Sequence, residues 1–270
     1  MKGKVIVVTG GSGVLCSAMA IHLAKLGGKI ALIGRTQSKL DVVASQIINA
    51  GGKAIAIAAD VLEKEALDTA HERILSELGP CDILINGAGG NHPNATTSTT
   101  RHGVENTVKG FFDLDPKAVG GVFDLNFIGT FLPSQIFGKD MLDRNGCTII
   151  NLSSMSAYAP LTKVMAYSAA KAAVSNFTQW MAVHFASASI RVNAIAPGFF
   201  LTEQNRALLT NEDGSLTARG NTIISQTPMR RFGQPEELLG VLEWLCSDSA
   251  SFVTGTVIPI DGGFNAFSGV

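Results

Sequence analysis

The 270-residue sequence has no long apolar run. A helix that crosses a bilayer needs about 20 consecutive apolar residues. The N-terminal stretch MKGKVIVVTGG has basic residues followed by only a short apolar run, unlike a secretory signal peptide. We therefore expect a soluble, untargeted cytoplasmic protein with no membrane partner.

Cysteine is scarce and scattered. Cys16, Cys81, Cys147 and Cys246 form no CxxC pair. This spacing predicts neither a disulfide framework nor a zinc site, and we expect no other metal site. Reduced thiols in a cytosol fit this pattern best.

Charge is also low. Only 16% of the residues are charged and the formal net charge is −1, so no basic surface for nucleic acid is indicated. Hydrophobic residues make up 46%, which suits a sheet buried on both faces. No repeat, and no linker rich in Pro, Gly or Ser, divides the chain. We expect residues 1–270 to form a single domain.

Short β-branched runs alternate with helical patterns along the chain. The runs predicted to be strands are residues 4–10, 29–35, 53–60, 81–89, 147–154, 190–198 and 256–263. Residues 17–28, 38–52 and 64–79 have helical spacing and end in glycine. Right-handed crossovers between such elements predict an α/β fold with a Rossmann-like, doubly wound parallel sheet.

Two segments are longer than ordinary connections between a strand and a helix. Residues 90–115 and 198–229 both follow the carboxyl ends of predicted strands, where open α/β sheets bind ligands. We predict that they are substrate loops. The alternative is that each is a surface loop without a ligand.

A glycine turn follows the first predicted strand. The stretch VVTGGSGVLCSAMA places Gly10, Gly11 and Gly13 between that strand and a helix. Backbone N–H groups and the helix dipole can bind a pyrophosphate there. Glycine can also serve a tight turn alone, but this position in a βαβ unit favours a dinucleotide.

The end of the second predicted strand bears on the choice of cofactor. NAD-selective folds usually carry an acidic side chain there, and this chain has Gly34. A 2′-phosphate can bind Arg35 and the hydroxyl of Thr36. We therefore favour NADP, with NAD possible; the alternative is that Arg35 is simply solvated.

Tyr167 and Lys171 are four residues apart in the stretch AYSAAKAAVSNF. On a helix they are neighbours, and the ammonium is expected to lower the phenol's pKa from about 10. Such a pair alone is more often an ordinary surface feature. Ser154, thirteen residues before Tyr167, ends a predicted strand at the same sheet edge, where it can donate a hydrogen bond to a carbonyl.

Together these motifs resemble the short-chain dehydrogenase/reductase family over nearly the whole chain. The resemblance rests on TGGSG, AAD with Asp60, NGAG from Asn86, LNFIGT with Asn126, YSAAK, IRVNAIAPG and DGG. It implies an NAD(P)-dependent oxidoreductase that transfers hydride between a secondary alcohol and a ketone.

The resemblance also implies four catalytic residues. Tyr167 would donate and accept the proton, and Ser154 would polarise the carbonyl. Lys171 would bind the nicotinamide ribose and lower the pKa of Tyr167. Asn126 would hold a water of the proton relay. The non-catalytic alternatives are that Ser154 caps a strand end and that Asn126 hydrogen-bonds a helix bend.

The cofactor-binding residues that the resemblance implies come from several strand ends. They are Gly10, Gly11, Ser12, Gly13, Val14, Leu15, Arg35, Thr36, Asp60, Val61, Asn86, Gly87, Ala88, Tyr167, Lys171, Pro197, Gly198 and Thr202. The chain departs from the family pattern TGxxxGxG, because Val14 and Cys16 occupy the second and third glycine positions. We expect the phosphate turn to differ in detail and Cys16 to lie near the phosphates.

NGAGGNHP and APGFFLTEQNRALLTNEDGSLT resemble the sugar-acid branch of the family, the bacterial D-mannonate oxidoreductases (fructuronate reductases). The resemblance implies D-mannonate and D-fructuronate as the substrate pair. The predicted substrate-binding residues are Asn91, His92, Ser154 and Arg206, with Gln204 and Asn205 as further polar groups. Arg206 can bind a carboxylate with two parallel hydrogen bonds. Alternatively, Arg206 faces solvent and Asn91, His92 or Lys163 meets the acid.

Other activities stay open at this point. A gluconate 5-dehydrogenase-like enzyme and a 3-oxoacyl-carrier-protein reductase are the alternatives among enzymes. A catalytically silent nucleotide-sensing protein is the non-enzyme alternative, and it predicts a broken set of catalytic residues. His92 can also be a loop histidine without a ligand.

The helix predicted over residues 169–181 is rich in alanine and carries Phe177 and Trp180. Its counterpart packs between subunits in tetrameric members of the resembled family, so we expect a homotetramer. A helix buried within one subunit would have the same pattern.

Overall fold

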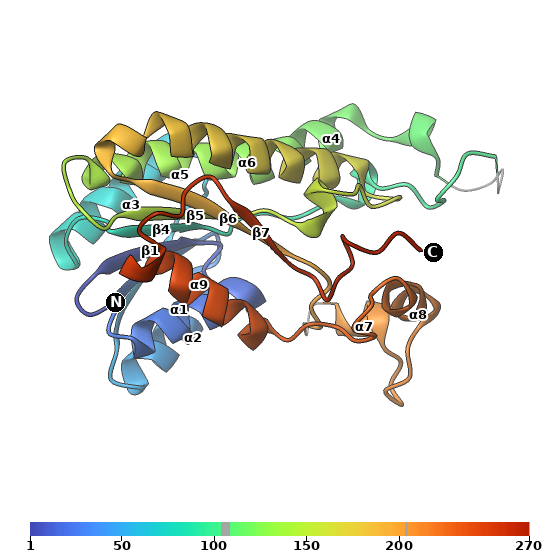
Figure 1. Ribbon diagram of the computed structural model, residues 1–270, viewed down its shortest axis with the longest axis horizontal. Helices are drawn as coiled ribbons and strands as arrows, with labels where there is room; N and C mark the ends of the chain where they lie inside the picture. Colours follow the sequence, from blue (N-terminus) through green and yellow to red (C-terminus); the bar gives the residue numbers. More distant parts are fainter. Residues whose placement is uncertain (104–108, 203–204, 270) are drawn as a thin grey trace.

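A parallel β-sheet forms the centre of the computed structural model, which describes residues 1–103, 109–202 and 205–269 (Figure 1). Among these residues the sheet has seven strands in the order β3-β2-β1-β4-β5-β6-β7. The strands are β1 (Val5–Thr9), β2 (Lys29–Gly34), β3 (Lys53–Ala58), β4 (Ile83–Asn86), β5 (Thr148–Leu152), β6 (Arg191–Pro197) and β7 (Val257–Ile260). The order reverses between β1 and β4, so the doubly wound fold is confirmed.

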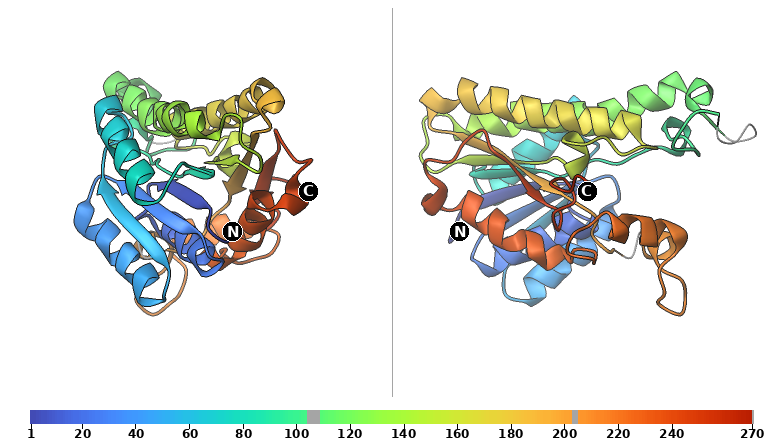
Figure 2. Two further views of the ribbon diagram at one scale, coloured as in Figure 1. Left: turned by 90° about the vertical axis from the view of Figure 1, so that its left-hand side faces the viewer. Right: turned by 45° about the vertical axis from the view of Figure 1, so that its right-hand side comes forward.

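Helices cover both faces of the sheet (Figures 1 and 2). The helices of the described residues are α1 (Val14–Lys25), α2 (Gln37–Asn49), α3 (Lys64–Glu77), α4 (Pro116–Phe123), α5 (Gly129–Phe137), α6 (Met165–His184), α7 (Arg206–Leu209), α8 (Ala218–Ser225) and α9 (Leu239–Cys246). Helices α1, α2 and α9 pack on one face, and α3, α5 and α6 on the other. None of the helices described here has the length and apolar character needed to span a membrane.

The central strand β1 shows why its sequence is apolar without alternation. Ile6 and Val8 belong to the core beneath α1, whereas Val5 and Val7 belong to the core on the opposite face. All four side chains are buried, because a parallel sheet covered on both faces leaves no polar side.

The two long excursions project beyond the same end of the sheet (Figure 1). Residues 90–115 contain two short 3-10 turns, Pro93–Ala95 and Phe111–Asp113, and residues 198–229 contain α7 and α8. The parts 104–108 and 203–204 of these predicted substrate loops, including Gln204, lie outside the described residues.

Candidate active site

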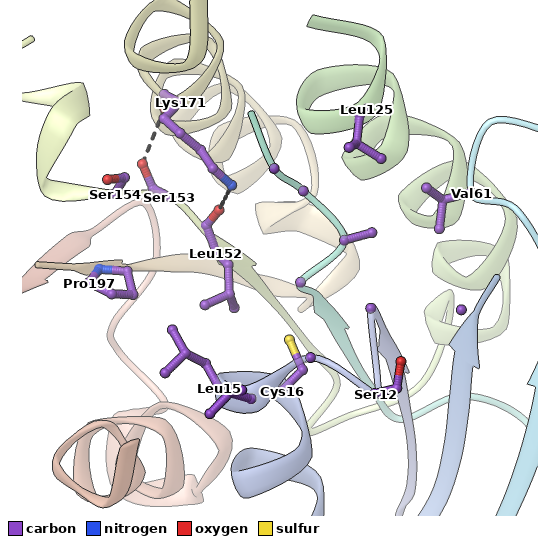
Figure 3. A pocket seen from close by; sticks show the side chains of 18 of the residues that line it. Ser12, Leu15, Cys16, Val61, Leu125, Leu152, Ser153, Ser154, Lys171 and Pro197 are labelled. Carbon is purple, nitrogen blue, oxygen red and sulfur yellow. Dashed lines mark hydrogen bonds between the residues drawn. The ribbon is translucent and has the colours of Figure 1, made fainter. Parts of the chain in front are cut away.

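A cavity of about 540 Å³ lies at the carboxyl end of the sheet, beside the ends of β1, β2, β4, β5 and β6 (Figure 3). It brings together most of the predicted cofactor-binding residues and three of the predicted catalytic residues. These are Gly10, Ser12, Gly13, Val14, Leu15, Arg35, Thr36, Val61, Gly87, Ala88, Ser154, Tyr167, Lys171, Pro197 and Gly198.

The turn between β1 and α1 leaves backbone groups available to an anion. Gly10 has φ +64°, and a Cβ there would lie 2.8 Å from the carbonyl oxygen of Gly87. Gly13 precedes α1 without a side-chain cap, and Val14 and Leu15 of the first turn line the cavity. The first N–H groups of a helix have no intrahelical acceptor, so this turn fits a pyrophosphate.

The wall beside β2 is cationic. Gly34, Arg35, Thr36 and Lys39 line the cavity there. No carboxylate lies among the cavity-lining residues that the structure describes. Sequence reasoning missed Lys39; the available signal was its place four residues after Arg35, in the first turn of the predicted helix.

Lys171 is buried on α6, with 4% of its surface exposed. Its Nζ donates a hydrogen bond of 2.6 Å to the carbonyl oxygen of Leu152 and lies 5.6 Å from the centroid of the Tyr167 ring. Burial lowers the pKa of Lys171 to about 8, and the nearby Cys16 opposes this shift. The helical neighbourhood of Tyr167 and Lys171 is as predicted.

The direction of the tyrosine pKa differs from our expectation. Burial raises the pKa of Tyr167 above its ordinary value, and a hydrogen bond with the Ser154 side chain lowers it in part. The expected lowering by Lys171 is wrong for this structure. Burial of the phenol sets the direction, and the ammonium lies over the ring while it binds the backbone of Leu152.

Ser154 both faces the cavity and stabilises the local chain. Its Oγ accepts hydrogen bonds from the N–H (3.2 Å) and the hydroxyl (3.0 Å) of Ser156, so it caps the short turn Met155–Ala157. The neighbouring Ser153 contacts Ser175 Oγ at 2.6 Å and donates to the carbonyl oxygen of Lys171 at 3.2 Å. The strand end is thereby fixed against α6.

Asn126 does not line the cavity but holds its wall. It lies in a π-helical segment, Asp124–Ile128, between α4 and α5. Its Oδ1 accepts from Gly90 N–H at 3.3 Å, and its Nδ2 donates to the carbonyl oxygens of Gly90 (2.7 Å) and Val122 (2.8 Å). These contacts fix the chain after β4 at the edge of the cavity.

Four of the predicted cofactor-binding residues are also outside the cavity wall. Gly11 packs on Leu32, and its N–H donates to the carbonyl oxygen of Ile33. Asp60 Oδ1 accepts from the N–H of Leu62. Asn86 is buried and bonds Ser134 and Asn151. Thr202, the fourth, lies beyond Gly198, and its N–H bonds Asn205.

The predicted substrate residues Asn91, His92 and Arg206 are not brought to this cavity. Asn91 donates to Thr96 Oγ1 at 2.9 Å, and His92 Nδ1 accepts from Asn94 N–H at 3.1 Å. Arg206 begins α7 and is exposed. Both loops carry these residues at the carboxyl end of the sheet, outside the cavity wall.

Sequence reasoning missed several other lining residues. Besides Lys39 they are Gly89, Gly90, Leu125, Leu152 and Ser153. Leu125 and Leu152 carried no signal because apolar residues in these segments fit the core equally well. Ser153 directly precedes Ser154, which the family resemblance included, and this adjacency was the available signal for Ser153.

The profile of the short chain dehydrogenase family matches residues 4–213. The chain belongs to this family. It is 57% identical over 271 residues to the uncharacterized oxidoreductase UxuB of Bacillus subtilis, covering 100% of this chain and 98% of the relative. The protein is therefore an NAD(P)-dependent dehydrogenase/reductase of the short-chain family.

Two solved structures show which cofactors similar proteins bind. A candidate D-mannonate oxidoreductase from Haemophilus influenzae with bound NAD has a TM-score of 0.97 at 50% identity, covering 100% of this chain and 98% of the other. A gluconate 5-dehydrogenase from Burkholderia cenocepacia, in complex with NADP and tartrate, has a TM-score of 0.85 at 27% identity, covering 98% and 96%. A nicotinamide cofactor is thus supported.

Proposed function

We propose that this short-chain dehydrogenase interconverts a secondary alcohol and a ketone on a sugar acid, with D-mannonate and D-fructuronate as the preferred pair. One observation carries the chemistry: Ser154, Tyr167 and Lys171 line the same cavity as the glycine turn. The substrate class is supported by the 50% identity to the candidate D-mannonate oxidoreductase.

The residues divide the work between binding and proton transfer. A bound nicotinamide cofactor supplies or accepts the hydride. The Gly10–Gly13 turn and the N-terminus of α1 bind the pyrophosphate, and Lys171 binds the nicotinamide ribose. Asn126 fixes Gly90 at the cavity edge. The resemblance to the family assigns it a second role, holding the water of the proton relay.

Tyr167 and Ser154 act on the reacting carbonyl. Ser154 donates a hydrogen bond to the carbonyl oxygen, which stabilises the negative charge that develops there. Because burial raises its pKa, Tyr167 is a neutral phenol at neutral pH and holds the proton that ketone reduction requires. In the oxidation direction the same oxygen takes the proton back.

We further propose that NADP is the preferred cofactor and that NAD is accepted. Arg35, Lys39 and the Thr36 hydroxyl line one side of the cavity, and they suit a 2′-phosphate. The related structures carry NAD in one case and NADP in the other.

Steady-state kinetics on a substrate panel tests the proposed activity. Fructuronate, 5-ketogluconate and an acetoacetyl thioester are reduced with NADPH and with NADH, and mannonate and gluconate are oxidised. We expect the highest kcat/KM for the fructuronate and mannonate pair. A higher value for 5-ketogluconate and gluconate favours the gluconate 5-dehydrogenase alternative, preference for the thioester favours the carrier-protein reductase, and no turnover favours the nucleotide-sensing alternative.

Arg206 is proposed to recognise the carboxylate of the sugar acid. Arg206→Ala should raise KM for the acid and hardly change the use of an uncharged ketone, since a lost charged hydrogen bond affects only the anion. Arg219→Ala, an exposed arginine of α8 in the same excursion, is the matched control. An unchanged KM in Arg206→Ala transfers this role to Asn91, His92 or Lys163.

We also propose that the protein forms a homotetramer in which subunits pack against one another through α6. Phe177 stacks on Trp180 at 6.2 Å between ring centroids, and Trp180 stacks on His184 at 4.6 Å. Trp180 is 56% exposed and Val183 81% exposed, so this face presents apolar surface to a second subunit.

A cytoplasmic location stays a prediction, supported by the four buried free thiols.

A further inference from the structure

The third residue of α1, Cys16, packs into space that a side chain at position 87 would need. Its side chain is buried, with 5% exposed, and it lines the cavity (Figure 3). A Cβ atom added to Gly87, directly after β4, would lie 2.2 Å from Cys16 Sγ. Real Cβ contacts are essentially never below 3.0 Å, so the thiol and the bare glycine backbone are complementary.

The backbone around Gly87 has little freedom to move away. Thr9 Oγ1 accepts from the N–H groups of Gly87 (3.1 Å) and Ala88 (3.2 Å). On the other side, a Cβ added to Gly10 would lie 2.8 Å from the carbonyl oxygen of Gly87. The ends of β1 and β4 are therefore in close contact, and the side chain of Cys16, on α1, packs against Gly87 at this contact.

The segment 87–90 connects this contact to Lys171 and Asn126. A Cβ added to Gly89 would lie 2.7 Å from Asn126 Oδ1 and 3.2 Å from Lys171 Nζ. Asn126 also binds the N–H and the carbonyl oxygen of Gly90. Within three residues of Gly87, the segment 87–90 therefore contacts the surroundings of Lys171.

The thiol fills space and does not act as a nucleophile. Burial raises the pKa of Cys16 to about 11, although the charge of Lys171 lowers it in part. A thiol with this pKa is neutral at neutral pH, and a neutral thiol is a weak nucleophile. Its volume, not its ionisation, matters to the neighbouring backbone.

We propose that Cys16 is a positioning residue for cofactor binding: its thiol, matched to the absence of a side chain at Gly87, sets the segment 87–90 against the bound nicotinamide cofactor and Lys171. The proposal rests on the proposed function in one respect, namely that the cavity binds that cofactor. It explains why this chain combines a cysteine at the family's third glycine position with a glycine after Asn86.

A double-mutant cycle with Cys16→Gly, Gly87→Ala and the double variant tests the pairing. Kd for NADPH and NADH is measured by fluorescence titration, together with kcat and KM. We expect Gly87→Ala to weaken cofactor binding by about tenfold or more, because overpacking shifts the wall. The double variant should regain most of this loss. Recovery is incomplete because the added Cβ still lies 3.0 Å from the carbonyl oxygen of Thr9.

Two controls separate the pair from general effects of each substitution. Gly240→Ala adds a methyl group on α9 where nothing lies within 4 Å, and Cys246→Gly removes a buried thiol from the same helix. Both should leave Kd unchanged. Effects of Cys16→Gly and Gly87→Ala that add independently overturn the proposal, as does coupling in the melting temperature with equal Kd in all variants.

A volume series at position 16 covers the case in which Gly87→Ala does not fold. Cys16→Ser should keep Kd within about threefold, whereas the smaller Cys16→Ala and the larger Cys16→Met should both weaken cofactor binding. Equal Kd across the series overturns the proposal. A wild-type protein that binds neither NADH nor NADPH overturns the proposed function and this proposal with it, so the two failures are distinguishable.

Discussion

Tyr167 and Ser154 line the same cavity, and the hydrogen bond between them lowers the pKa of Tyr167 in part. We predict that Tyr167→Phe binds the cofactor like the wild type, because only the hydroxyl is removed. Turnover should fall by about 10²–10⁴, the usual effect of losing a general acid/base. Stopped-flow and steady-state rates measure the loss, and a cofactor titration provides the control. Wild-type turnover in the purified variant would remove Tyr167 from the mechanism.

Lys171 makes the stability of the cofactor-free protein dependent on pH. Its folded pKa of about 8 lies below the ordinary value of 10.5, so the unfolded chain binds a proton between these values that the folded protein has released. Stability contributed at this site therefore rises with pH from about 8 to 10.5. Relative to Lys171→Met, the wild type should gain free energy of unfolding across this window.

Urea denaturation of both proteins between pH 7 and 10.5 measures this difference. Titrating groups that do not interact with Lys171 are common to the two proteins and cancel in the comparison. Curves that run parallel across the window would show that Lys171 has an ordinary pKa in the fold.

Single residues differ in how far the sequence predicted them. Tyr167 and Lys171 were found because a spacing of four residues fixes two neighbours on any helix. The direction of the tyrosine pKa was wrong because burial depends on chain segments far away in sequence. The contact between Cys16 and Gly87 was likewise hidden, since it joins residues 71 positions apart, one on α1 and one directly after β4, that meet only in the folded chain.

At the level of elements, the proposed preference for NADP depends on the turn from β2 into α2. We predict that Arg35→Ala weakens NADPH binding much more than NADH binding, by roughly 10-fold or more, because a charge-assisted contact is lost. Lys39→Ala should shift the preference in the same direction. The exposed Lys25→Ala on α1, outside the cavity, is the control. Equal effects on both cofactors, or a wild type that prefers NADH, would contradict the assignment.

The strands were predicted well and the π-helical segment was not. All seven strands lie within the predicted runs, because each buried parallel strand is a short apolar run bounded by turn residues. Helix α1 begins at Val14, three residues before the predicted start, because the glycine turn that ends at Gly13 directly precedes it. Asn126, in the segment Asp124–Ile128, binds Gly90, and a contact between residues 36 positions apart is not encoded by any local pattern.

For the whole molecule, the exposed face of α6 predicts assembly. Val183→Glu should dissociate the proposed tetramer, because a charge at the centre of an apolar contact is left desolvated. Light scattering coupled to size-exclusion chromatography measures the mass. The exposed Val42→Glu on α2 is the matched control. A wild-type monomer, or a tetramer unaffected by Val183→Glu, would contradict the role of this face.

The strand order also has a consequence for synthesis of the chain. Strand β1 can pair with β2 once residues up to 34 have left the ribosome, but its other neighbour, β4, ends only at residue 86. Until then the growing polypeptide has an unpaired central edge of apolar residues, which is prone to pair with other chains. The cavity wall is complete only after Gly198, so for most of translation no ligand of this site can protect the nascent protein.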